Sequence, residues 1–260
     1  MQDSAPNRLK SWFSNYVSSF YTGDEEFDRV IQLKETHTAR VSIGVRRLGR
    51  ALNLGPRELR LAEIIGLLHD VGRFGQYARY RTFRDRISEN HGKLGLRVIS
   101  RHGLLSGFDS CERRHIARAV ALHNSTRLPA LTDVTSLFFL KLIRDADKLD
   151  IWRVAIGHSN GRGRTAKVVN EFNLSGDGCC SPAVLAAIRA GRVVPIDAVR
   201  SANDAKLLYI SWVFDMNFRP SFRETLRGRY LDRLAVTMPD SADVRNVLQI
   251  ARRHAARNAA

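Results

Sequence analysis

The chain has 260 residues, enough for one large domain or for one domain with an appended subdomain. Its hydrophobic content of 44% is typical of a soluble protein, and no apolar run approaches the roughly 20 residues that span a bilayer. The 42 basic residues outnumber the 26 acidic ones, which gives a net charge of +16. The basic residues are spread along the chain and only 8% of residues are aromatic, so the charge favours a small polyanionic substrate over a nucleic acid.

The N-terminus and the cysteines indicate a reducing compartment. The first residues, Met-Gln-Asp-Ser-Ala-Pro, lack the basic and then apolar segments of a signal peptide. The three cysteines are odd in number, two of them (Cys179 and Cys180) are adjacent, and no Cys-x-x-Cys motif is present. We therefore expect a cytoplasmic protein without a disulfide framework and without a membrane partner.

Helical periodicity dominates the first part of the chain. Residues 1–23 carry an aromatic stripe that we expect to pack on the main domain, and residues 24–53 predict one long helix that ends before a Gly-Pro pair. A second helix is predicted over 58–70. The stretch 73–86 shows no clear period and is dense in arginine and aromatic residues, so it is predicted to be a loop.

Further helices are predicted over the rest of the chain. One covers 89–101 with Ser88 as its N-cap, one covers 110–123, and one covers 133–152. Glycine-, arginine- and turn-rich sequence near 160–180 predicts a small irregular or β insertion. Three helical segments follow, near 182–190, 203–217 and 241–256.

These elements predict an all-α fold. We divide the chain into an N-terminal packing helix over 1–23, a main domain over 24–157, and a C-terminal helical extension of the same domain over 158–260. No internal repeat and no low-complexity tract interrupts this arrangement.

The second predicted helix ends in His69 and Asp70, two adjacent residues that can bind a cation. An imidazole and a carboxylate at the end of a buried helix are unfavourable unless something binds them. His37 lies on the apolar stripe of the long first helix, and Asp147 lies on that of the fifth helix. We therefore expect three helices to converge on a borderline divalent ion with coordination positions left for water.

Asp147 has acidic neighbours that compete for the same role. At about 100° per residue, Asp145 and Asp147 lie ~200° apart on a helix, so only one of them can easily face the core. Asp147 shares its stripe with Leu140. Two interpretations stay open for the others: Asp145 and Asp150 are solvated carboxylates paired with neighbouring basic side chains, or Asp150 orients a nearby histidine or lysine.

In their order along the chain, His37, the His69-Asp70 doublet and Asp147 resemble the HD-domain superfamily of metal-dependent phosphohydrolases. The resemblance covers roughly residues 25–155, and Asp147 precedes Lys-Leu where the family has its last ligand. It implies a helical bundle, one or two divalent ions (Mn, Fe, Co, Ni, Zn or Mg) and hydrolysis of a phosphate ester, often of a nucleotide. The Gly-Tyr-Pro signature of the cyclic-dinucleotide phosphodiesterases with this fold is absent.

His91 and His123 are further candidates. In binuclear members of the superfamily, histidines between the doublet and the last aspartate hold a second ion, and both residues lie on predicted apolar faces. Asp70 would then bridge the two ions and could accept a proton from the attacking water. Alternatively, His91 and His123 contact the phosphate, protonate the leaving group, or serve as hydrogen-bonded core histidines.

Basic residues near the doublet are candidates for binding the substrate. One guanidinium group can bind two phosphate oxygens at once. The alternative for any single basic side chain is that it is solvated and does not contact the substrate. The candidates are Arg73, Arg81, Arg84, Lys93 and Lys148.

The residues and the resemblance together predict a metal-dependent phosphohydrolase that uses metal-activated water to cleave a phosphate ester, with a nucleotide as the expected substrate. A homodimer is compatible with the sequence, and nucleic acid is a less favoured partner. The rival hypothesis is a non-catalytic metal- or nucleotide-binding regulatory module with a basic, RNA-binding surface.

Overall fold

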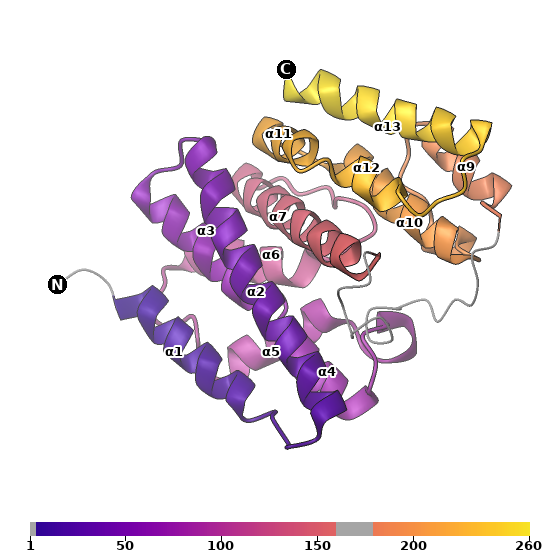
Figure 1. Cartoon of the computed structure of the whole chain (residues 1–260). Coiled ribbons are helices and arrows are strands. Elements are labelled where there is room, and N and C mark those ends of the chain that lie inside the picture. Colours follow the sequence, from indigo (N-terminus) through magenta and orange to yellow (C-terminus); the bar gives the residue numbers. More distant parts are fainter. Residues whose placement is uncertain (1–3, 160–178) are drawn as a thin grey trace. The chain divides into compact units, whose positions relative to one another are not determined.

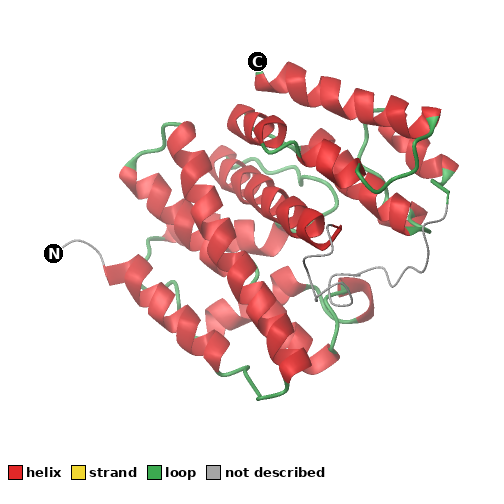
Figure 2. Cartoon of the chain, in the orientation of Figure 1, coloured by secondary structure: helices red, strands yellow, loops and turns green. Residues whose placement is uncertain are grey.

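The computed structural model describes residues 4–159 and 179–260, and both stretches fold into helices joined by loops (Figure 1, Figure 2). Within these stretches no residue belongs to a β-strand, and the predicted all-α fold is confirmed. The insertion predicted at 160–180 lies outside the described residues, except for its last two positions. In the described parts of the chain, no helix combines the length and apolar character needed to cross a bilayer.

The chain divides into two compact units, Met1–Asp147 and Lys148–Ala260. The division falls inside helix α7 (Val134–Ser159), ahead of the boundary that the sequence analysis sets after residue 157. Each unit has its own buried apolar core, which includes Val41, Leu68 and Phe74 in the first and Trp152, Leu207 and Val247 in the second. All six predicted metal ligands belong to the first unit.

The first unit contains α1 to α6 and the N-terminal part of α7. Helices α2 and α3 pack side by side, α4 packs against α5, and α5 packs against α6 (Figure 1). The bounds are α1 Ser4–Ser18, α2 Glu25–Ala51, α3 Pro56–Leu68, α4 Gly72–Tyr80, α5 His91–Arg101 and α6 Ser110–Leu122, with a 3₁₀ turn, η1, at Asp85–Ile87.

Acidic side chains begin two of the helices that the periodicity predicts. Asp24 accepts a hydrogen bond from the amide of Phe27 (2.7 Å) at the start of α2, and Asp109 accepts one from the amide of Glu112 (2.9 Å) at the start of α6. These side chains satisfy amide groups that have no acceptor inside the helix. The predicted helices over 24–53 and 110–123 accordingly agree with α2 and α6 within two residues at each end.

The prediction of a loop over 73–86 is wrong for its first half, which forms α4. Phe74 of this helix is fully buried, and its ring packs against those of Phe13 and Tyr16 in α1. A helix of nine residues offers too few apolar positions for a period to show in the sequence, so these contacts decide its structure. The same contacts dock the aromatic stripe of α1 on the first unit, as expected.

The N-cap predicted for the next helix is also wrong. Asn90, two residues beyond Ser88, caps α5 by accepting a hydrogen bond from the amide of Lys93 (3.0 Å). The Ser88 hydroxyl instead donates to the carbonyl of Arg84 (2.8 Å) and closes the turn that contains η1. His91 therefore becomes the first residue of α5, which matters for the site described below.

The second unit contains the C-terminal part of α7, which continues to Ser159 instead of ending at 152 as predicted. The three predicted C-terminal segments correspond to α9, to α10 followed by the 3₁₀ turn η3, and to α13. The helices α11 and α12 are absent from the prediction, because each is too short for a helical period to be recognised in the sequence. The bounds are α9 Pro182–Arg189, η2 Ile196–Ala198, α10 Ala202–Ser211, η3 Trp212–Asp215, α11 Arg219–Arg227, α12 Tyr230–Ala235 and α13 Ala242–Ala259.

Gly72 allows α4 to approach the start of α5 closely. A Cβ at this position would lie 2.2 Å from the carbonyl oxygen of His91 and 2.5 Å from the amide nitrogen of Gly95. Both are backbone atoms, so the helices would have to move apart. We expect Gly72→Ala to lower the free energy of unfolding by about 1–3 kcal/mol, measured by urea denaturation.

Gly75→Ala, in the same helix, is the matched control. A Cβ there would come no closer than 4.0 Å to a neighbouring atom, the hydroxyl of Tyr16. This substitution should leave stability unchanged or raise it by up to about 1 kcal/mol, because alanine favours a helix over glycine. Equal destabilisation by the two substitutions would contradict the close approach at Gly72.

Candidate metal centre

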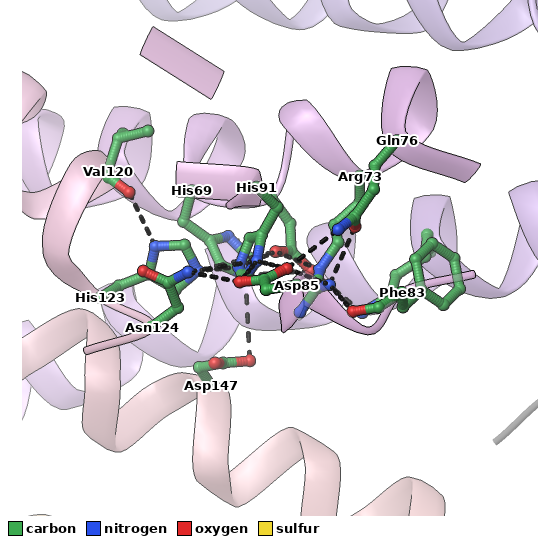
Figure 3. A network of polar contacts seen from close by, with 12 residues as sticks. His69, Arg73, Gln76, Phe83, Asp85, His91, Val120, His123, Asn124 and Asp147 are labelled. Carbon is green, nitrogen blue, oxygen red and sulfur yellow. Dashed lines mark hydrogen bonds and ion pairs between the residues drawn. The ribbon is translucent and has the colours of Figure 1, made fainter. Parts of the chain in front are cut away.

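The structure brings the six predicted metal ligands together inside the first unit. Figure 3 shows His69, His91, His123 and Asp147 of this group. Their ligand atoms fall into overlapping groups of three in which all atoms lie within 4.8 Å of one another. Five of the six residues are buried, and the side chain of Asp147 is 19% exposed. The six are His37 of α2, His69 and Asp70 after α3, His91 at the start of α5, His123 after α6, and Asp147 of α7.

Asp70 lies at the centre and offers one carboxylate oxygen to each of two histidine pairs. Its Oδ2 is 3.6 Å from Nε2 of His37 and 3.9 Å from Nε2 of His69. Its Oδ1 is 3.4 Å from Nε2 of His91 and 3.6 Å from Nε2 of His123. This is the arrangement of a carboxylate that can bridge two ions.

Asp147 completes the first of these groups. Its Oδ1 is 3.1 Å from Nε2 of His37 and 3.9 Å from Nε2 of His69. His37, His69, Asp147 and Oδ2 of Asp70 therefore form one group, and His91, His123 and Oδ1 of Asp70 form a second. The two groups adjoin, because ligand atoms of His123, His69 and Asp147 also lie within 4.8 Å of one another.

Two of the histidines are oriented by their own helices. Nδ1 of His69 donates to the carbonyl of Gly66 (2.8 Å), and Nδ1 of His123 donates to the carbonyl of Val120 (2.8 Å). Both residues directly follow the last turn of a helix, where carbonyl groups lack an amide partner. Because the proton sits on Nδ1, the Nε2 atom of each neutral ring carries a lone pair directed at the centre.

His91 is oriented by a side chain. Its Nδ1 donates to the carboxylate of Asp85, with contacts of 2.9 and 2.8 Å to the two oxygens. Its Nε2 lies 3.0 Å from Nε2 of His123. Two neutral rings in this arrangement direct lone pairs at each other, which is unfavourable unless a proton or a cation lies between them.

These residues fit a divalent metal ion. Nε2 of His69 is buried and has no hydrogen-bond partner among the described residues, although it carries a lone pair. An atom of this kind loses its interaction with water and gains nothing from the protein, and a cation would satisfy it. Neutral imidazoles together with carboxylates are the ligands that Mn, Fe, Co, Ni and Zn prefer.

In a comparison with protein families, residues 35–152 match the family model of the HD domain. This part of the chain is an HD domain. The matched range includes all six clustered residues, and HD domains are generally metal-dependent hydrolases. Searches among curated proteins and among solved structures found no match.

Charge compensation keeps the central carboxylate of the HD domain ionised. Burial raises the pKa of Asp70, but the Lys34 ammonium and the other polar groups around it, Arg73 among them, lower it well below its ordinary value. Nζ of Lys34 is 3.1 Å from Oδ2 of Asp70, and Nε of Arg73 is 3.5 Å from Oδ1. Lys34 is missing from the predicted site, although it precedes His37 by three residues and so shares a face of α2 with it.

Asp85 and Asn124 are also missing from the predicted site. Asp85 lies in the turn before α5, and besides His91 it accepts hydrogen bonds from Asn124 (2.8 Å) and Gln76 (2.9 Å) (Figure 3). The turn has no helical period, so the sequence contains no signal that would select Asp85. Asn124 directly follows His123, and only this adjacency could have pointed to it.

The predicted substrate-binding residues differ in their surroundings. Arg73 lies beside the centre, and its Nη1 donates to Gln76 (3.0 Å) and pairs with Asp85 (3.3 Å). Arg81 ends α4 in a left-handed conformation with its guanidinium 4.1 Å from the centroid of the Phe27 ring. The remaining candidates are Arg84 and Lys93, both exposed, and Lys148, which lies in the second unit, is buried, and pairs with Asp215 there.

The interpretation of Asp145 and Asp150 as solvated carboxylates is wrong. Their exposed fractions are 0% and 3%. Asp150 does form the expected ion pair, since its Oδ1 is 3.4 Å from Nη1 of Arg153. The helix α7 is surrounded more completely than its amphipathic pattern suggests, so carboxylates off the main apolar stripe are buried too.

The buried imidazoles should make the metal-free protein less stable in mild acid. Burial lowers the pKa of His69 to about 4 and that of His91 to about 3, from 6.5 in the unfolded chain. Below pH 6.5 the unfolded state therefore takes up protons that the folded state does not. We expect the free energy of unfolding to fall by up to about 1.4 kcal/mol per pH unit for each imidazole, measured by urea denaturation with chelator present.

Two variants test the origin of this pH dependence. His91→Gln should reduce the slope between pH 6.5 and 5, whereas replacement of the exposed His102 by Gln should leave it unchanged. A free energy of unfolding that is constant between pH 7 and 5 in the metal-free protein would show that the two rings are not buried in their neutral form.

Proposed function

We propose that the protein is a metal-dependent phosphohydrolase that cleaves a phosphate ester of a nucleotide with water. The observation that carries this proposal is the position of Asp70, which presents one oxygen to the pair His37 and His69 and the other to the pair His91 and His123. A domain that only packed its core would gain nothing from placing four imidazoles and two carboxylates together.

The residues divide into two sets of ligands. His37, His69 and Asp147, with Oδ2 of Asp70, would hold one ion, and His91 and His123, with Oδ1 of Asp70, would hold a second. A divalent ion held in this way lowers the pKa of a bound water and supplies a nucleophile near neutral pH. Three or four protein ligands for each ion leave positions for water and for a phosphate oxygen.

The surroundings of His91 and Asp70 favour ligand roles over proton transfer. The pKa of His91 is lowered to about 3, so the ring is neutral at pH 7 and has no proton on Nε2 to give to a leaving group. Asp70 has a lowered pKa and is therefore a weak base. Water is therefore a better proton donor or acceptor for the reaction than His91 or Asp70. Solvent can reach the centre at Asp147, whose carboxylate is partly exposed.

Two cations beside Asp70 could stabilise charge on the phosphate. Nζ of Lys34 lies 5.0 Å from the centroid of the Phe83 ring, and the guanidinium carbon of Arg73 lies 5.5 Å from it. Both cations are therefore on one aromatic side chain at the edge of the centre. Positive groups placed there interact most strongly with the transition state, in which negative charge on phosphate oxygens develops.

Two aromatic side chains favour a nucleotide as the substrate. The rings of Phe83 and Tyr77, 5.0 Å apart between centroids, lie next to the cations and offer apolar surface for a base. The net charge of +16 supports the rival function, a regulatory module that binds RNA. Such a module would show affinity for RNA that falls steeply with salt and no phosphate release.

Metal-dependent hydrolysis can be tested with a panel of nucleotides. We expect phosphate or nucleoside release that stops with chelator and returns with Mn²⁺. His69→Ala should lower kcat/KM at least about 100-fold, because a lost metal ligand removes several kcal/mol of transition-state stabilisation. His102→Gln should retain full activity. Turnover that is insensitive to chelator, or undiminished in His69→Ala, would contradict the proposal.

The number of ions is a separate prediction. After equilibrium dialysis against Mn²⁺, elemental analysis should give two ions per chain for the wild type. His123→Ala should give one, because it removes a ligand of the second group and leaves in place His37 and His69, whose Nε2 atoms lie 3.1 and 3.9 Å from Oδ1 of Asp147. At most one ion in the wild type would refute the two-ion centre.

A further inference from the structure

Asp85 is a point of convergence beside the proposed centre. Four donors reach its carboxylate: Nδ1 of His91 (2.8 Å), the amides of Asn124 (2.8 Å) and Gln76 (2.9 Å), and the guanidinium of Arg73 (3.3 Å). They come from α4, from the start of α5 and from the residue after His123 (Figure 3). The carboxylate itself is 27% exposed, so the network lies between the buried centre and the surface.

The position of His91 in its helix explains why this network exists. His69 and His123 donate their Nδ1 protons to carbonyls of the preceding helical turn. His91 is the first residue of α5, so no earlier turn of its own helix offers a carbonyl to its ring. A side chain must therefore supply the acceptor, and Asp85 does so.

We infer that Asp85 is a positioning residue that fixes the tautomer and orientation of His91 and thereby sets the affinity of the site formed by Asp70, His91 and His123 for its divalent ion. This inference rests on the two-ion centre proposed above. A carboxylate behind an imidazole holds the proton on Nδ1, turns Nε2 toward the ion and makes it a stronger ligand.

The other three donors hold Asp85 itself in place. Gln76 donates to Asp85 and also to the Ser88 hydroxyl (2.9 Å) and the Glu89 carbonyl (2.8 Å), so it ties the turn before α5 to α4. These donors and the Arg73 guanidinium (3.3 Å) together reach both oxygens of the Asp85 carboxylate. The carboxylate is therefore ionised and fully used as an acceptor. An asparagine there would direct an amide donor at other donors.

The test is a titration of the wild type and of Asp85→Asn with Mn²⁺. Calorimetry measures binding, and electron paramagnetic resonance detects exchange-coupled Mn²⁺ pairs. We expect the dissociation constant of the second ion to rise ~10–100-fold and that of the first ion to change less than about threefold. In Asp85→Asn, the signal of the coupled pair should be absent at Mn²⁺ concentrations that saturate the wild type, and it should appear at higher Mn²⁺ concentrations.

Asp133→Asn is the matched control, since Asp133 also lies near a histidine (His115, 3.5 Å) and pairs with Arg118 (2.9 Å) at the start of α7. It should bind both ions as the wild type does. Asn124→Ala is a second variant that keeps the carboxylate but removes one of its donors, and it should weaken the second ion alone, by less than Asp85→Asn does.

The outcomes separate this inference from the proposed function. A wild type that binds two ions while Asp85→Asn and Asn124→Ala both bind the second ion normally would overturn the role of Asp85 and leave the function standing. Loss of both ions in parallel in either variant would show that Asp85 only supports the fold. A wild type that binds a single ion would overturn the two-ion centre and this inference with it.

Discussion

The interaction on which the rest of the first unit depends is the burial of the Asp70 carboxylate between two pairs of imidazoles. A buried carboxylate is strongly unfavourable without compensation. Lys34 and Arg73 provide part of this compensation, one at each oxygen. Neither cation satisfies the orphaned Nε2 of His69, and a divalent metal ion would do so.

The positions of three clustered histidines at the ends of helices determine how their rings are oriented. His69 and His123 each come directly after a helix, so main-chain carbonyls of that helix orient their rings without help from another side chain. His91 begins its helix and must be oriented by Asp85, which in turn needs its own supporting donors. The orientation of His91 therefore depends on side chains of the turn before α5 and of α4, whereas His69 and His123 depend on main-chain carbonyls.

Close packing of backbone at Gly72 links the fold to the site. The absence of a side chain there lets α4 contact the first turn of α5, which carries His91. The HD domain over residues 35–152 thus places its clustered histidines and aspartates by contacts between short helices as well as by the long helices α2 and α7. The buried acidic residues Asp145 and Asp150 show that α7 is enclosed on more than one side.

The sequence by itself was sufficient for the all-α class, for the long helices and for the order of the ligands, because a repeated apolar stripe or a helix-ending doublet is a local property of the chain. Periodicity reports the face on which a side chain lies, and not the partner that it meets. Only the tertiary structure could therefore decide that Asp70 divides its oxygens between two histidine pairs, that residues from Gly72 to Tyr80 form a helix, and that Asp85 supports His91. These features depend on contacts between segments that no local pattern relates to each other.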